Sequence, residues 1–159
     1  MKKSIYLFLA LLLPILIFLF LKFFGKNEFA VNPLYVSELP VVPADCPAVT
    51  KLPYLVPDSV MNDIASADSL TVMFFGKMEN EEANQLSRAK EEIASDPVLI
   101  IAYPESERTA FRRRCIFFLD DKTCVVLVDS DGSIRGTYAA NRKEIDRLLT
   151  EITIILKKY

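Results

Sequence analysis

Hydrophobic and polar residues are distributed unevenly along the chain, and its first segment is almost wholly apolar. From Ile5 to Leu21 no side chain carries a charge, and Phe23 and Phe24 extend this apolar run around Lys22. At about 1.5 Å per helical residue, a run of this length spans the ~30 Å hydrocarbon core of a bilayer. The pattern therefore predicts one transmembrane helix, about Ile5 to Phe24.

A cleaved signal peptide is the alternative interpretation, because Lys2 and Lys3 form a basic start. The apolar run is longer than the roughly 7 to 15 residues usual in signal peptides, and no small-x-small cleavage site follows it. We therefore expect residues 1–26 to be retained as an anchor, with the lipid bilayer as partner. Under the positive-inside rule, Lys2 and Lys3, partly offset by Lys22 and Lys26, favour a single-pass protein of the cell membrane with its body outside the cytoplasm.

Prolines dominate the next segment, and six of the nine in the chain fall between Pro33 and Pro57. This density prevents helix formation and favours extended chain. The sequence predicts an extended tether over residues 27–67. Four apolar side chains of this tether are candidates to pack on the body: Tyr35, Leu39, Tyr54 and Leu55.

Short apolar runs then alternate with a helical pattern. The runs Leu70 to Phe75 and Val98 to Tyr103 are typical of strands buried on both faces. Between them a helix is expected from about Asn80 to Ser95, with Asn80 as its cap and apolar residues on one side. Strand, helix and strand within about 35 residues predict a right-handed parallel βαβ unit.

The last third of the chain predicts a hairpin and a closing helix. Cys115 to Leu119 reads as a short strand, and Cys124 to Asp129 pairs with Ser133 to Tyr138 around an Asp-Gly turn. Asn141 caps a final helix that reaches Lys157, with an apolar stripe along it. We expect the hairpin to share one sheet with the two parallel strands, covered by both helices.

Composition excludes several classes of function. The 159 residues suit one domain, and removing the four lysines of residues 1–26 from the 19 basic residues leaves 15 against 21 acids, a net charge of −6. An acidic body lacks the basic surface that nucleic-acid binding requires. There is no histidine, which excludes Ser-His-Asp and Cys-His catalysis and sites that need imidazole.

The order of elements is that of thioredoxin-like domains, so the fold class expected is α/β, an N-terminal transmembrane helix plus a small thioredoxin-like domain at residues 68–159. The ending VVLVDSDGSIRGTY at 125–138, with EIDRL at 144–148, resembles the Sco/SenC family. The opening is similar too, with FGKN at 24–27, DCP at 45–47 and PYLVPD at 53–58. The resemblance implies a membrane-anchored relative of copper chaperones for cytochrome oxidase assembly.

The copper ligands of that family are missing. The family binds copper through a C-x-x-x-C motif after the first core strand and a histidine before the hairpin. Here the corresponding positions are Met78, Glu82 and Lys122. The resemblance therefore implies a degenerate relative without metal or other cofactor.

The three cysteines cannot form a C-x-x-C centre, because they are separated by 69 and 9 residues. Cys115 and Cys124 flank a short connection and are the candidate disulfide or redox pair, the alternative being two small buried residues on adjacent strands. Cys46 is then the odd cysteine, either an accessible thiol or an inert residue packed by Pro47.

Three charged motifs have simpler explanations. Asp129-x-Asp131-Gly132 resembles the start of a calcium loop, but a hairpin turn is favoured because oxygen ligands do not follow. Glu79, Glu81 and Glu82 suit a helix N-terminus rather than acid-base catalysis. Residues 112–114 are three arginines, either a charged strand edge or a contact for lipid headgroups or an acidic partner.

These observations favour a non-catalytic interaction module that assists a membrane complex by binding an unidentified membrane or extracytoplasmic protein. The first alternative is a thiol-disulfide redox protein that uses Cys115 and Cys124, with Cys46 as a resolving thiol. The second is an atypical copper carrier that draws on Cys115, Cys124 and Met78.

Overall fold

The computed structural model of the protein describes residues 11–20, 22, 30–39, 42–64, 70–77 and 79–157. The chain divides into two compact units, Met1–Ala30 and Val31–Tyr159. In the first unit, residues 11–20 are helical. Among the described residues, no helix is both long and apolar enough to cross a membrane. Much of the predicted span, including Ile5 and Phe24, lies outside the described residues.

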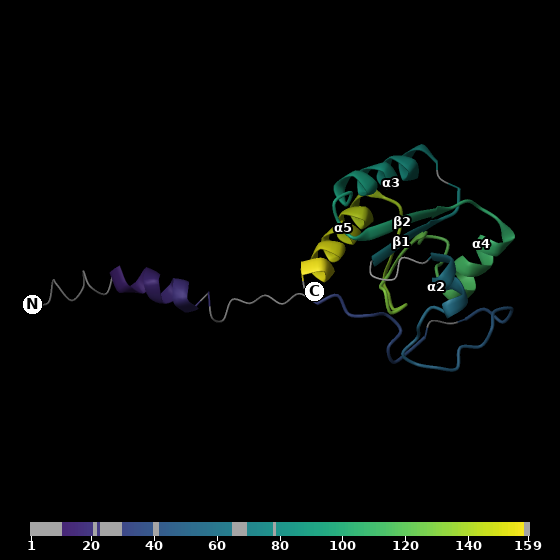
Figure 1. Ribbon diagram of the computed structural model, residues 1–159, viewed down its shortest axis with the longest axis horizontal. Coiled ribbons are helices and arrows are strands. Elements are labelled where there is room, and N and C mark those ends of the chain that lie inside the picture. Colours follow the sequence, from purple (N-terminus) through teal and green to yellow (C-terminus); the bar gives the residue numbers. More distant parts are fainter. Residues whose placement is uncertain are drawn as a thin grey trace, which may run out of the picture. The chain divides into compact units, whose positions relative to one another are not determined.

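The second unit is a mixed α/β domain (Figure 1). Its elements, in chain order, are α2 (Asp58–Ile64), β1 (Leu70–Phe75), α3 (Asn80–Glu92), β2 (Val98–Tyr103), α4 (Glu107–Phe111), the π-helical turn η1 (Arg112–Ile116), β3 (Val125–Val128), β4 (Ile134–Tyr138) and α5 (Arg142–Lys157).

The four strands form one sheet in the order β2-β1-β3-β4. β1 and β2 are parallel, in a register that pairs Leu70 with Val98 and Phe75 with Tyr103. β3 lies antiparallel to β1 and to β4. The predicted four-stranded arrangement is therefore confirmed.

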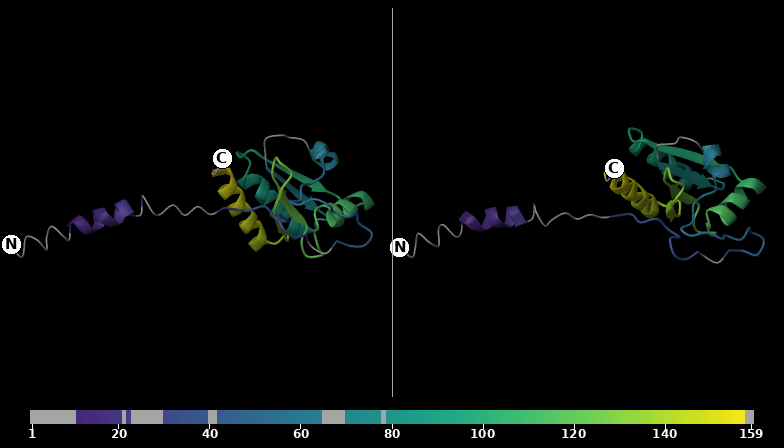
Figure 2. Two further views of the ribbon diagram at one scale, coloured as in Figure 1. Left: turned by 90° about the horizontal axis from the view of Figure 1, so that it is seen from below. Right: turned by 60° about the horizontal axis from the view of Figure 1, so that its bottom comes forward.

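Side chains alternate between the two faces of the sheet. On β1, Val72 and Phe74 belong to one apolar cluster, and Met73 and Phe75 belong to the other. The first cluster is completed by residues of α3 and α5, and Figures 1 and 2 show these helices together on one side of the sheet. We call this side the helical face.

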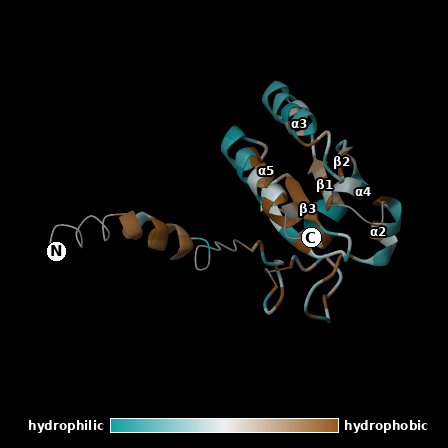
Figure 3. Ribbon diagram, turned by 60° about the vertical axis from the view of Figure 1, so that its left-hand side comes forward, coloured by the Kyte–Doolittle hydropathy of each residue, from teal (hydrophilic) through white to brown (hydrophobic). Residues whose placement is uncertain are grey.

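The opposite side is covered by irregular chain, α2 and η1. Its cluster includes Tyr54 and Val56 from the proline-rich segment, Val60 and Ile64 from α2, and Phe117. Because a disulfide ties this cover together, as described below, we call it the disulfide face. Figure 3 shows apolar residues, in brown, along the strands enclosed between the two covers.

The segment expected to be an extended tether is packed against the sheet from Val31 onward. No helix occurs in its described residues before Asp58, as the prolines predict, but α2 fills Asp58–Ile64. Tyr54 is buried, and Tyr35 and Leu39 are partly buried against the same cluster. Leu55 instead points outward and is 50% exposed, because Tyr54 and Val56 beside it face the core.

The predicted strand from Cys115 to Leu119 is wrong, because residues 107–116 are helical. Ser106 begins this helix by accepting a hydrogen bond from the Thr109 N–H, at 3.2 Å. Phe117 and Leu119 are buried as the apolar pattern requires. A short apolar run satisfies a strand or the end of a helix equally well, so burial alone did not distinguish them.

The two long helices, α3 and α5, occur where the sequence predicts them. The cap and the last residue of α3 differ from the prediction, whereas those of α5 agree with it. The N-cap of α3 is Glu79 rather than Asn80, and the helix ends at Glu92. At the start of α5, the side chain of Asn141 accepts from the Glu144 N–H at 3.0 Å, which confirms the expected cap.

Candidate functional site

The candidate functional site is a pocket at the carboxyl end of β1. The end of a strand, the beginning of α3 and the loops beside the hairpin meet there, as is common for sites in α/β folds. Gly76 makes the turn that leaves β1, with φ at +108°. The pocket has a volume of about 450 Å³ and is lined by Phe74, Phe75, Gly76, Lys77, Glu81, Glu82, Glu105, Arg113, Asp121, Lys122, Cys124, Ala139, Ala140 and Asn141.

Cys124 contributes a thiol to the lining of this pocket. The backbone carbonyl of Cys124 accepts from the Phe75 N–H at 2.8 Å, and its own N–H donates to the Tyr138 carbonyl at 3.0 Å, so the sheet fixes its position. Burial raises the pKa of the thiol, against the smaller lowering effects of the Ala140 backbone and Arg113. At neutral pH the thiol is therefore protonated, which makes it a weak nucleophile and a poor metal ligand.

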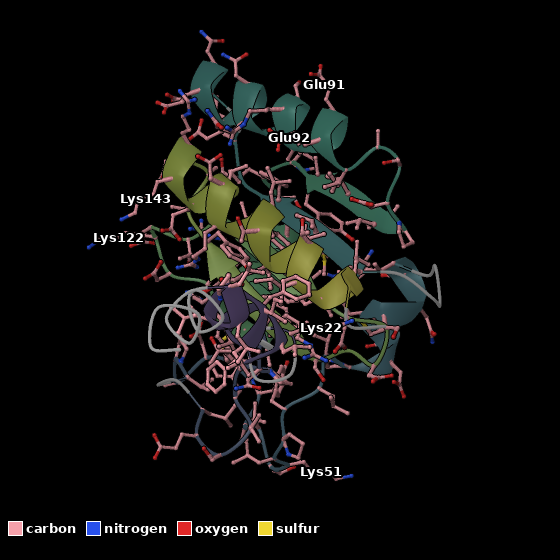
Figure 4. All side chains as sticks on the ribbon, turned by 90° about the vertical axis from the view of Figure 1, so that its left-hand side faces the viewer. Lys22, Lys51, Glu91, Glu92, Lys122 and Lys143 are labelled. Carbon is pink, nitrogen blue, oxygen red and sulfur yellow. A yellow bond between two sulfur atoms is a disulfide. The ribbon has the colours of Figure 1, made fainter. Side chains whose placement is uncertain are left out.

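Of the three positions that the Sco/SenC resemblance sets against copper ligands, the structure describes Glu82 and Lys122. The Glu82 carboxylate accepts from the Glu79 N–H at 2.7 Å and so serves the start of α3. Lys122 is exposed and points outward (Figure 4), and Met78 lies outside the described residues. In the described part of the chain, no group of three or more cysteines, histidines or carboxylates is placed to hold a metal ion.

One wall of the pocket is a loop held by Arg113. The Arg113 guanidinium donates to the carbonyls of Asp120 at 2.5 Å and Thr123 at 3.2 Å. Inside the loop, hydrogen bonds from the Thr123 hydroxyl and backbone lower the pKa of Asp120. Arg113 Nε is buried and has no hydrogen-bond partner among the described residues. Through its Nη2 atom the arginine therefore fixes the shape of this wall of the pocket.

The disulfide joins Cys46 to Cys115, with 5.3 Å between their Cα atoms, and Cys124 is the free cysteine. The proposed pairing of Cys115 with Cys124 is therefore corrected, and so is the accessible thiol at Cys46. The reason is the helical conformation of η1, which buries Cys115 on the disulfide face, whereas Cys124 lies at the pocket, directly before β3.

Four consecutive residues of η1 make tethers to three other parts of the chain, namely α2, the loop at residues 120–123 and the segment at residues 45–46. Arg112 pairs with Asp63 of α2, Arg113 holds the loop at residues 120–123, Arg114 pairs with Asp45, and Cys115 bonds to Cys46. All three guanidiniums thus have partners within the chain. The strand-edge explanation of these arginines is wrong.

Sequence reasoning missed this arrangement, although one signal was present. Asp45 precedes Cys46 and Arg114 precedes Cys115, and the two charged residues form an ion pair beside the disulfide.

Asp129, the first residue of the calcium-loop alternative, serves the hairpin turn instead. Its carboxylate accepts from the N–H groups of Asp131 and Ser133 and from Arg135 Nε, so it is used within the hairpin.

Charged and polar residues make up much of the lining of the pocket. The described lining contains carboxylates, cations and the protonated thiol of Cys124. The disulfide at Cys115 of η1 is not part of this lining. The chain has no histidine that could act as a base. The chain matches no protein-family model, and no curated protein shows significant similarity to it.

Proposed function

We propose that this protein is a membrane-anchored, thioredoxin-like module, with its body outside the cytoplasm, that acts by binding other proteins rather than by thiol or metal chemistry. The strand order β2-β1-β3-β4, with one parallel pair and a closing hairpin, supports a thioredoxin-like fold. The apolar residues 5–24 support the anchor.

The distribution of the cysteines is the observation that carries this proposal. A thioredoxin-like redox protein needs two thiols that exchange with each other at the end of the first core strand. Here that end carries Gly76 and Lys77, and among the described residues that line the pocket Cys124 alone contains sulfur. Cys115 is 4% exposed and bonded to a residue 69 positions away, which suits a structural disulfide.

The disulfide also supports the location. Disulfides persist in oxidising compartments and are rare in the cytoplasm. A structural bond between Cys46 and Cys115 is therefore consistent with a body that the anchor holds on the outer side of the membrane.

The Sco/SenC resemblance suggests the process. A relative that kept the anchor, the DCP sequence at 45–47 and the hairpin, but not the ligands, would keep the partner-binding surfaces of its ancestor. On this basis the proposed role is in the assembly of a respiratory membrane complex. The metal-binding steps of that assembly would belong to other proteins.

Two assays on the full chain in detergent test the proposal. We expect no retention of Cu(I) against a competing chelator and no catalysis of insulin disulfide reduction by dithiothreitol. The combined variant Met78→Cys, Glu82→Cys and Lys122→His restores the family's ligand types and serves as the positive control for copper. One equivalent of Cu(I) retained by the wild type, or insulin reduction lost on Cys124→Ser, would overturn the non-catalytic interpretation.

A further inference from the structure

The two edges of the sheet are protected differently. At the β4 edge, the Leu34 N–H donates to the Ile134 carbonyl at 2.7 Å, and Arg135 donates to the Val31 carbonyl at 2.9 Å. The amino-terminal part of the second unit thus covers that edge. At the other edge, β2 pairs with β1, and no described segment pairs with its outer side.

β2 has none of the features that usually keep an edge strand from pairing. Its sequence, VLIIAY, contains no charge, no proline and no glycine. Five of its six residues are partly exposed and Ala102 is exposed, whereas all six residues of β1 are buried. An apolar edge of this kind is a template for another strand.

The backbone direction identifies the groups that are available. The Tyr103 carbonyl accepts from the Gly76 N–H and therefore faces β1. Because backbone groups alternate along a strand, those of Ile101 also face β1, and those of Ile100 and Ala102 face outward. A ligand that pairs with the outward N–H and C=O groups of both residues must itself be an extended peptide.

A second cavity lies at the carboxyl end of this edge. It has a volume of about 440 Å³ and is lined by Gly76, Lys77, Ala102, Tyr103, Pro104 and Glu105. It shares Gly76, Lys77 and Glu105 with the larger pocket. A strand added to β2 would therefore run to a cavity able to receive one of its side chains.

Charges at the two ends of β2 select the partner. Asp96 precedes the strand and Glu105 follows it, and both are exposed. Antiparallel pairing of two copies through their outward groups, with Val98 opposite Ala102, would bring Asp96 of one copy beside Glu105 of the other, and like charges this close across a strand pair are destabilising. A strand with basic residues at its ends would instead be attracted at both.

We propose that the outer edge of β2 binds an extended, mainly apolar segment of a partner protein whose ends carry lysine or arginine, by adding it to the sheet as a fifth strand. This mode of recognition takes its affinity from main-chain hydrogen bonds and its specificity from alternate side chains. The inference rests on the proposed function, because it names the surface and the partner chemistry of the interaction module.

The test uses the full chain in detergent and a fluorescent peptide of alternating valine and threonine flanked by lysine pairs. We expect it to bind and to slow hydrogen exchange at the amides of Ile100 and Ala102. Ala102→Pro removes an outward donor and is expected to weaken binding about tenfold. Ala102→Val, which keeps the donor, is the matched control.

A charge exchange provides a second measurement that does not alter the strand. The double variant Asp96→Lys with Glu105→Lys should weaken binding of the lysine-flanked peptide and strengthen binding of the same peptide flanked by glutamates. Glu38→Lys, at an exposed position outside β2, should change neither affinity. Absence of binding, unchanged exchange at Ile100 and Ala102, or dimers that the peptide dissociates would overturn the proposal. A failure of the non-catalytic function would appear separately, in the copper and insulin assays.

Discussion

The two faces of the sheet are built in different ways. The helical face is regular, because α5 places Ile145, Leu148 and Ile152 at helical spacing and all three are at most 1% exposed. The disulfide face is covered by the short helix α2, the π-helical turn η1 and a proline-rich segment without regular structure. Polar contacts occur on both sides, for example between Arg88 and Asp146 under the first cover and between Arg112 and Asp63 under the second, but only the second cover has a disulfide among the described residues.

The disulfide face shows how a segment without regular structure can become part of a core. A segment without helix or ladder hydrogen bonds must gain stability from specific tethers. Here η1 supplies four of these from consecutive residues, and the Tyr54 hydroxyl donates to the Ile116 carbonyl at 2.8 Å. The disulfide face should therefore fail through loss of its tethers, and the helical face through loss of apolar volume.

Removal of the disulfide, by Cys46→Ser together with Cys115→Ser, should lower the free energy of unfolding more than any other change considered below. The bond closes a loop with a sequence separation of 69 residues, and the chain-entropy relation gives a loss of roughly 4 kcal/mol in the free energy of unfolding. Urea unfolding of the full chain in detergent measures it. Cys124→Ser is the control, since that sulfur is unbonded, and an equal loss in the control would contradict the assigned pairing.

A cavity in the helical face should cost nearly as much and behave differently. Ile152 is fully buried, and Ile152→Ala is expected to lower the free energy of unfolding by about 3 kcal/mol. Because no disulfide serves this face, the loss should be the same in oxidised and reduced protein. A loss that depends on the redox state would show that the two faces are not independent.

The edge of the helical face also contains a tight contact. A Cβ at Gly136 would clash with the Tyr138 hydroxyl, which donates to Glu151 at 2.6 Å. Gly136→Ala must therefore displace the tyrosine and is expected to cost about 2 kcal/mol. Tyr138→Phe loses the hydrogen bond alone and should cost about 1 kcal/mol. Equal unfolding midpoints for the alanine variant and the wild type would refute this contact.

The smallest effect concerns alkaline pH. Burial, with a smaller contribution from Tyr35, raises the pKa of Tyr54 to about 12 from an ordinary value of 10.0. A raised pKa in the folded state gives stability that is present below pH 10 and is lost between about pH 10 and 12. Tyr54→Phe should cost about 1 kcal/mol at neutral pH through the lost hydrogen bond, and the difference from wild type should shrink across that range. A constant difference would contradict the buried tyrosine.

The sequence predicts the helical face well because its signals are local. Strands β1 to β4 and helices α3 and α5 follow from apolar runs, the Asp-Gly turn and helical periodicity. The position of the pocket follows too, since the βαβ unit brings the end of β1 to the start of α3. Each of these features is determined by residues that are close in the sequence.

The disulfide face could not be predicted in the same way. The pairing of Cys46 with Cys115 depends on the path of the proline-rich segment, which has no periodicity to read. The run CIFFL at 115–119 suits a strand, but the Ser106 cap and the contacts of the three arginines favour a helix that ends within it. Assigning Cys115 to a strand is also what made Cys124 appear to be its partner.

The connectivity of the three cysteines is the decisive measurement, because both the tethering of the disulfide face and the lack of a second free cysteine to pair with Cys124 depend on it. The protein is alkylated under denaturing conditions without reduction, digested, and analysed by mass spectrometry. We expect a peptide pair linking Cys46 to Cys115 and an alkylated Cys124. A link between Cys115 and Cys124, with alkylated Cys46, would contradict the account and restore the redox interpretation.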